Sequence, residues 1–507
     1  MFANFSRRTF IVGAGASLAS SALADAPARS LVPQARPGAP RAVAAPAIQV
    51  STRSAASAQA LMQKAQLSGK VGFAVADARS GLILESHNLA AAMPPASVAK
   101  AITALYGLDT LGSAHQFITQ IIVTGPISGG KVQGDLILAG TGDPALSTDG
   151  LASMAARLKA LGVTGVTGKF KVYGGALPLI HAIEPGQPDH VGYNPAVSGL
   201  NLNYNRVHFQ WVPSGGSYKV AMDARSDKYR PAVSSSRMQI VNRDLPVYAY
   251  KRGQNMIDEW SVSRKALGGK AGSRWLPVRR PDLYAGETFQ ALASAYGVRL
   301  PKVQLADRLP QGTAIVSHGS SDLSRLTRDM MKWSTNLTAE VIGLTATRKR
   351  GQNAGSLKAS AGAMSNWMRQ GLGAQQARLV DHSGLSDASK VSAQDMVKML
   401  VKMGPGGVLH SHMKAVAPKN AEGKTNANAA HKINAKTGTL NFVSSLAGYV
   451  TTGDGSTLAF SIFTADMQQR SRIAKADRER PQGGKAWGAR SRWLQHQLIN
   501  RWAGLYG

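Results

Sequence analysis

The chain has 507 residues and contains no cysteine, which excludes disulfide bonds, thiol catalysis and thiolate metal sites. Its length provides for two or three domains, and its hydrophobic content of 44% is that of a globular protein with a large core. The 59 Lys and Arg residues outnumber the 28 Asp and Glu residues, and the resulting net charge of +31 favours an anionic partner.

The first 24 residues have the features of a twin-arginine signal peptide. Arg7 and Arg8 precede an apolar stretch of small side chains at residues 11–23, which ends in alanine-rich cleavage sites. An uncleaved signal anchor is the alternative. Residues 25–50 are rich in proline, alanine and arginine without apolar periodicity, as is typical of a flexible linker. We therefore expect export to the periplasm.

Three S-x-x-K strings occur in the chain, and their surroundings differ. They begin at Ser97, Ser128 and Ser411 and end at Lys100, Lys131 and Lys414, respectively. The first follows two prolines and opens a run of apolar residues, which predicts a buried helix with the serine at its start and the lysine one turn later. The second is glycine-rich and predicts a hairpin turn, and the third is followed by a proline and polar residues. Ser97 is therefore the candidate nucleophile, although alone it also fits an ordinary helix N-cap.

Short apolar or alternating runs after the first string predict strands. They lie at residues 121–124, 135–139, 169–173 and 207–211. We therefore expect mostly β structure over residues 122–303.

Two further short strings follow in the C-terminal half. Residues 334–336 read S-T-N and lie in a helix-compatible region, and residues 436–438 read K-T-G. Two runs after the K-T-G string predict neighbouring strands, at residues 445–450 and 457–463. Lys436 is therefore expected on a strand of an antiparallel sheet.

Basic residues are concentrated near the C-terminus. Residues 470–492 contain eight Lys or Arg residues and two acids. This pattern predicts a mobile basic segment that contacts an anionic surface, followed by a helix at residues 493–502; a solvated charge run without a partner is the alternative. His410 and His412 have no third ligand nearby in sequence, so no metal site is expected.

The three strings, in this order, resemble the corners of the serine acyl-transfer site of penicillin-binding proteins and serine β-lactamases. The 237 positions between Ser97 and Ser334 exceed what a compact β-lactamase needs. Further stretches support a more specific likeness, at residues 134–144, 193–203, 318–323 and 381–386. As a set, these features resemble the low-molecular-mass class C penicillin-binding proteins, the D-alanyl-D-alanine carboxypeptidase/endopeptidase family.

The resemblance implies an α+β fold with a core like that of serine β-lactamases and penicillin-binding transpeptidases. Residues 51–121 and 304–507 would form this acyl-transferase core. Inserted, mostly β domain material at residues 122–303 would split it.

The resemblance also implies roles for the residues of the strings. Ser97 is the expected nucleophile and Lys100 the base, which requires that the lysine pKa is lowered. Ser334 is expected to relay a proton to the leaving amine, and Asn336 to orient Lys100 and hold a substrate amide. The backbone N–H groups of Ser97 and Thr439 are the expected oxyanion hole. One side of the site is expected to bind the substrate carboxylate and backbone. It consists of Lys436, Thr437, Gly438 and Thr439.

The implied activity is hydrolysis of the terminal D-Ala-D-Ala bond of peptidoglycan stem peptides, or of the D-Ala cross-link, with β-lactams as covalent inhibitors. No cofactor and no nucleic-acid partner are expected. A β-lactamase or esterase on the same core and a non-catalytic peptidoglycan-binding protein are the alternatives. Glu340 and Glu422 do not form the Glu-x-x-Asn pattern of class A β-lactamases, which argues against fast penicillin breakdown. Three places depart from the family pattern: Thr335 stands in place of Asp, His382 in place of Gly, and residues 464–467 where the family often has a strand that ends in Asn.

Overall fold

The computed structural model describes residues 55–507. The expected signal peptide and linker lie outside the described residues. Within residues 55–507, no helix is both long and apolar enough to span a bilayer.

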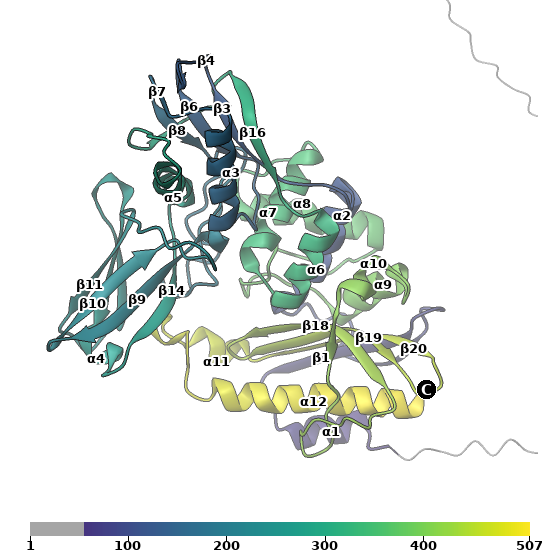
Figure 1. The fold of residues 1–507 in the computed structure, drawn as a ribbon. Coiled ribbons are helices and arrows are strands. Elements are labelled where there is room, and N and C mark those ends of the chain that lie inside the picture. Colours follow the sequence, from purple (N-terminus) through teal and green to yellow (C-terminus); the bar gives the residue numbers. More distant parts are fainter. Residues whose placement is uncertain (1–54) are drawn as a thin grey trace, which may run out of the picture. The chain divides into compact units, whose positions relative to one another are not determined.

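A six-stranded antiparallel sheet forms the base of the part that carries the K-T-G string (Figure 1). Its strands, in spatial order, are β17 (Lys414–Val416), β18 (Lys432–Leu440), β19 (Val443–Thr451), β20 (Thr457–Ala465), β1 (Lys70–Asp77) and β2 (Ile83–His87). The predicted strands at residues 445–450 and 457–463 are thus confirmed as β19 and β20. Helices α1 (Ala58–Ala65) and α12 (Gly484–Leu505) lie along one face of this sheet.

The C-terminal helix α12 is longer than the expected helix at residues 493–502 and is held by a regular apolar face. Leu494, Leu498 and Trp502 recur at intervals of four residues, so they lie on one side of the helix. All three are fully buried against the sheet, where the Trp502 ring lies 5.7 Å from that of Phe73. Burial of such side chains stabilises the fold by about 1.5–3 kcal/mol each.

Helices cover the other face of the sheet. The central one is α2 (Ala99–Leu111), in which residues 99–107 are all buried, as expected for a helix that is apolar on every side. The helices around it are α6 (Leu323–Trp333), α7 (Asn336–Lys349), α8 (Leu357–Leu372), α9 (Ala393–Met403) and α10 (Val408–His412). Part of this layer forms one apolar cluster with β1, β19 and β20, and a second cluster joins α6 and α7 to residues of the insertion.

A five-stranded sheet begins the inserted part. Its strands, in spatial order, are β15 (Gln304–Leu305), β8 (Phe170–Tyr173), β6 (Leu136–Gly140), β3 (Ile118–Val123) and β16 (Thr313–Gly319). Helices α3 (Thr148–Ala160) and α5 (Pro281–Ala295) pack on it. Strands β3 and β16 pair antiparallel. Because β3 starts before residue 122 and β16 lies after residue 303, this sheet extends past the expected limits of the insertion at both ends.

Two three-stranded sheets complete most of the insertion. One consists of β10 (Ser217–Asp223), β9 (Arg206–Ser214) and β14 (Gly272–Pro277), and the other of β11 (Ser236–Val241), β13 (Asp258–Ser263) and β12 (Tyr248–Arg252). The four strands predicted from apolar runs are β3, β6, β8 and β9, so the expected mostly β insertion is present.

Residues 466–483, hereafter the connecting segment, lead from β20 to α12 and include α11 (Met467–Ser471). Arg470 is only 3% exposed and forms an ion pair with Asp387 of the core. Glu479 contacts His190 at 2.7 Å and Arg274 at 2.8 Å, both of the insertion. The prediction of a mobile segment is therefore wrong over these residues, because the chain there is tied to both parts. Contact of the basic region with an anionic surface stays a prediction.

Candidate active site

Ser97 lies in a short 3-10 turn, η1 (Ala96–Val98), that leads directly into α2. Pro94 and Pro95 precede this turn, and Ala96 adopts the left-handed backbone conformation with φ of 45°. Such backbone is uncommon for residues other than glycine and persists where surrounding contacts enforce it. The turn places Lys100 one helical turn after Ser97, and the Lys100 Nζ donates a hydrogen bond to the Ser97 Oγ at 2.9 Å.

The Lys100 side chain is fully buried and has two further hydrogen-bond acceptors. Its Nζ donates to the Asn336 Oδ1 at 2.7 Å and to the Ser383 carbonyl oxygen at 2.8 Å. Burial lowers the pKa of Lys100 to about 8, against the opposing influence of the Glu340 and Asp381 carboxyls. Only a neutral amine can take a proton, so this shift is the one that a base requires.

The S-T-N string forms the junction between α6 and α7. Ser334 ends α6 in the left-handed conformation, with φ of 59°, and Asn336 is the first residue of α7. The Asn336 Nδ2 donates to the Tyr193 carbonyl oxygen at 2.8 Å. Asn336 therefore links the Lys100 amine to the inserted part of the chain.

Lys436 lies on β18 and is almost completely buried. Its Nζ donates to the Ser334 Oγ at 3.0 Å and to the Thr437 carbonyl oxygen at 2.8 Å. Burial is the main cause that lowers the pKa of Lys436 to about 6, and repulsion by Lys100 and Lys414 adds to it. The hydroxyl of Ser334 is thus in contact with the second lysine of the site.

Strand β18 approaches η1 so closely that no side chain fits between them. A Cβ on Gly438 would lie 2.7 Å from the Pro95 carbonyl oxygen and 2.9 Å from the Ser97 backbone nitrogen. The glycine of the K-T-G string therefore lets the strand lie directly beside the nucleophile. Thr437 next to it is half-buried, and Thr439 is exposed.

Residues 381–384 close the site from the side of α7 and belong to one of the stretches that carry the family resemblance, in which Asp381 and Ser383 were expected to have a structural or edge-of-site role. The two carboxylate oxygens of Glu340 accept hydrogen bonds from the backbone N–H groups of His382 and Ser383, each at 2.9 Å. This holds the Ser383 carbonyl against Lys100. The sequence carries only a weak signal for this role of Glu340. Glu340 follows Asn336 by four residues and therefore shares its face of α7.

His382, the departure from the family pattern, has a structural explanation. Its ring lies against the backbone of α7 at Gly343, where an added Cβ would come within 2.1 Å of the ring Nδ1. The ring Nε2 forms a hydrogen bond with the Ser360 hydroxyl at 2.8 Å. Burial lowers the pKa of His382 to about 3, so the ring is neutral and acts as a packed core side chain.

The two other S-x-x-K strings lie elsewhere and in other conformations. Ser128 and Lys131 flank a two-glycine turn between β4 (Ile127–Ser128) and β5 (Lys131–Val132), as predicted. Ser411 is in α10 and donates to the carbonyl of Val408. The structure therefore brings Lys100 into contact with both Ser97 and Asn336 and places Ser334 and Lys436 beside each other. The catalytic roles assigned to them stay predictions.

The chain is similar to known proteins over most of its length. Residues 54–481 match the model of the D-Ala-D-Ala carboxypeptidase 3 (S13) family. The D-alanyl-D-alanine carboxypeptidase of Actinomadura sp. (strain R39) is 28% identical over 441 residues, which cover 80% of this chain and 79% of the relative. The D-alanyl-D-alanine carboxypeptidase DacB of Haemophilus influenzae is 24% identical over 446 residues, or 82% of this chain and 90% of the relative.

The fold is also that of a solved relative. The crystal structure of penicillin-binding protein 4 from Haemophilus influenzae superposes with a TM-score of 0.69 at 20% identity, and the match covers 88% of this chain and 99% of that chain. Because the family model spans most of the chain, the protein belongs to the D-Ala-D-Ala carboxypeptidase 3 (S13) family of serine peptidases.

Proposed function

We propose that the protein is a serine-type D,D-peptidase that cleaves the terminal D-Ala-D-Ala bond of peptidoglycan stem peptides, or the D-Ala cross-link, through an acyl intermediate on Ser97. The observation that carries the proposal is the fully buried Lys100 amine, 2.9 Å from the Ser97 Oγ, with its pKa lowered to about 8. A hydroxyl beside a buried amine is the arrangement that activates a weak nucleophile.

The reaction follows from the contacts. Lys100 takes the proton of Ser97 as the Oγ attacks the carbonyl carbon of the penultimate D-Ala. The departing amine of the terminal D-Ala takes a proton from the Ser334 hydroxyl, which lies 3.0 Å from the Lys436 Nζ, and Ser334 is reprotonated with the proton that Lys100 took up. Water then attacks the ester and gives a proton to the neutral Lys100, which returns it to the Ser97 Oγ as the shortened peptide leaves with a new carboxylate.

The K-T-G strand supplies the substrate contacts in this proposal. Lys436 carries the positive charge for the terminal carboxylate of the substrate, assisted by the hydroxyls of Thr437 and Thr439. The backbone N–H groups of Ser97 and Thr439 bind the oxyanion, and one such donor contributes about 2.7–4 kcal/mol. The close approach of Gly438 to Ser97 supports this, because it sets the strand beside the scissile bond.

β-Lactams are proposed to acylate Ser97 as substrate mimics. The Haemophilus influenzae penicillin-binding protein 4 has been crystallised in complex with a β-lactam, and that structure matches this chain with a TM-score of 0.67. The proposed location of the protein is the periplasm, and the twin-arginine pattern and the substrate class support export to it.

Covalent labelling with a fluorescent penicillin tests the proposal. We expect the wild-type protein to be labelled and the Ser97→Ala variant not to be. Serines of the two other S-x-x-K strings provide matched controls, and the variants Ser128→Ala and Ser411→Ala should label like the wild type. Equal labelling of Ser97→Ala and the wild type would refute the assigned nucleophile.

A second experiment distinguishes the two possible activities. Mass spectrometry of muropeptides digested by the wild type separates carboxypeptidase products from endopeptidase products.

A further inference from the structure

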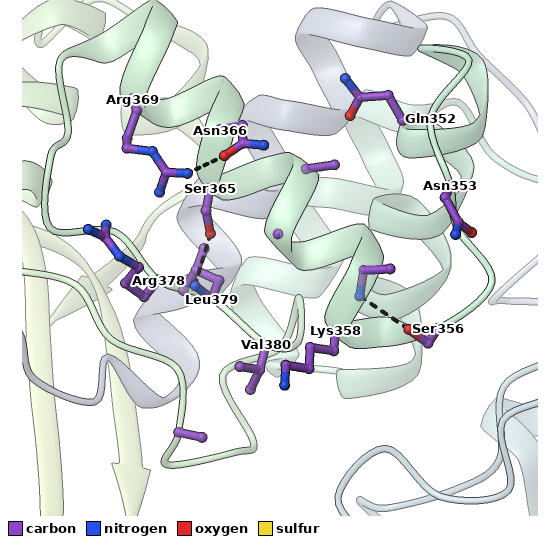
Figure 2. Close-up of a pocket in the computed structure, with 14 residues that line it drawn as sticks. Gln352, Asn353, Ser356, Lys358, Ser365, Asn366, Arg369, Arg378, Leu379 and Val380 are labelled. Atoms are coloured by element: carbon purple, nitrogen blue, oxygen red, sulfur yellow. Dashed lines mark hydrogen bonds between the residues drawn. The ribbon is translucent and has the colours of Figure 1, made fainter.

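A groove of about 760 Å³ runs along α8, and Ser97 is not among the residues that line it (Figure 2). We call it the α8 groove. Its floor consists of the small side chains Ala359, Gly362 and Ala363, at helical spacing. A Cβ added to Gly362 would meet no atom within 4 Å, so the space above the floor is open.

The charge of the α8 groove is uncompensated. Lys358, Arg369 and Arg378 line it, and none of its lining residues is an acid. Within residues 55–507, none of these three cations is part of an ion pair. Both guanidiniums donate instead to the backbone carbonyl of Ala377, each at 3.0 Å. These bonds hold the arginines in place without neutralising their charge.

The cations occupy two ends of the groove. Arg369 and Arg378 lie close together, and Lys358 lies near Ser356 at the start of α8 (Figure 2). Eleven residues of helix separate Lys358 from Arg369, or about 16 Å along the axis. The groove therefore fits an extended anionic molecule with separated charges better than one compact ion.

A second cavity of about 400 Å³ shares Ser356, Lys358 and Val380 with the α8 groove. It is also lined by Asp381 and Ser386, which belong to the same loop as the Ser383 carbonyl that contacts Lys100. The two cavities together extend from α8 to the loop that supports the catalytic base. A polymer bound in the α8 groove can thus reach the neighbourhood of the site.

We propose that the α8 groove is a second binding site for stem-peptide carboxylates of polymeric peptidoglycan, occupied while another stem is in the active site. The inference rests on the proposed function, because that function supplies a polymer with repeated carboxylates. Binding at two places on one polymer converts the second contact into an intramolecular one and raises the overall affinity. The groove then selects the polymeric substrate over free peptides.

The test uses the full chain in a Ser97→Ala background, so that insoluble peptidoglycan sacculi are bound but not digested. The groove variant is Lys358→Ala/Arg369→Ala/Arg378→Ala. The matched control removes three exposed cations of the insertion, Lys219→Ala/Lys228→Ala/Lys270→Ala. In a co-sedimentation assay, we expect the groove variant to lose about tenfold in affinity for sacculi and the control to lose less than twofold.

A second variant guards against misfolding, because Arg369 and Arg378 also hold the Ala377 carbonyl. Lys358→Glu changes one exposed side chain, reverses its charge and should also weaken binding to sacculi. With Ser97 restored, turnover of a soluble D-Ala-D-Ala peptide should equal that of the wild type, while release from sacculi should fall.

Three results would overturn the proposal. The first is an equal loss of affinity for sacculi in the groove and control variants. The second is unchanged binding of sacculi by both groove variants. The third is that the groove variants lose binding to phosphatidylglycerol vesicles while their binding to sacculi stays intact, which would assign the groove to a lipid surface. Failure of the proposed function is distinguished from these, because it would appear as absent turnover of the soluble peptide by the wild type.

Discussion

Two buried lysines with lowered pKa values share the site, and the proposed mechanism gives each of them a different task. Burial lowers the pKa of both amines, to about 8 for Lys100 and about 6 for Lys436. A carboxylate arriving at Lys436 favours its charged form, and the new charge repels a proton from Lys100. In the proposed mechanism, the substrate carboxylate thus favours the neutral Lys100 that takes the proton of Ser97, and the carboxylate of penicillin has the same effect.

This pair predicts a definite pH dependence. Acylation needs neutral Lys100, and the neutral fraction of Lys100 grows as the pH rises through its pKa. The rate of penicillin acylation should therefore increase with pH, with a midpoint at about 8 or lower. Stopped-flow labelling between pH 6 and 9 measures it, with circular dichroism to confirm that the fold persists. A rate that is flat or falls over this range would contradict the role of Lys100.

Glu340 predicts a positioning effect at the same scale. In Glu340→Gln, an amide NH2 replaces one carboxylate oxygen and faces a backbone N–H of His382 or Ser383, so one buried donor loses its acceptor. Such a loss costs about 1–3 kcal/mol in the free energy of unfolding, which urea denaturation measures. Acylation should also slow, since the Ser383 carbonyl is no longer held against Lys100. The exposed Glu422→Gln should change neither quantity.

At the scale of elements, the site depends on how closely β18 and η1 approach. In Gly438→Ala, the new Cβ would overlap the Pro95 carbonyl and the Ser97 nitrogen, so the strand must move away from the nucleophile. A displacement near 1 Å can reduce a rate about 100-fold, and we expect a loss of that order in penicillin acylation. Gly371→Ala, where the new Cβ meets nothing within 4 Å, should label normally. Normal labelling of Gly438→Ala would show that the close approach is dispensable.

The elements also show what a sequence can reveal about this site. The order of the three strings, read through the family resemblance, predicted that Ser97, Lys100 and Lys436 belong to one site. Apolar runs predicted β3, β6, β8 and β9, because buried strands need such side chains. Glu340 was seen only as a failed β-lactamase pattern. Its spacing of four from Asn336 places it on the same face of α7, but its contact with residues 382–383 depends on how α7 packs against a loop about forty positions later.

At the scale of the whole molecule, the connecting segment joins the core to the insertion. Its sequence looked mobile because eight cations crowd residues 470–492, and charge runs are usually solvated. The pairing partners lie far away in the chain: Asp387 is 83 residues before Arg470, and His190 is 289 residues before Glu479. Local composition carries no information about such partners, so the prediction failed there.

The last prediction concerns this connection. Arg470 is almost completely buried, pairs with Asp387 and donates to the Asn441 carbonyl at 3.0 Å, so Arg470→Ala leaves both acceptors without their donor. We expect faster hydrogen exchange in residues 381–387 and 466–483, and a loss of about 1–3 kcal/mol in stability. Arg492→Ala removes an exposed cation of the same basic region and should change neither. If both variants exchanged alike, the segment would be the solvated run that its composition suggests, and it would not contribute to holding the insertion on the core.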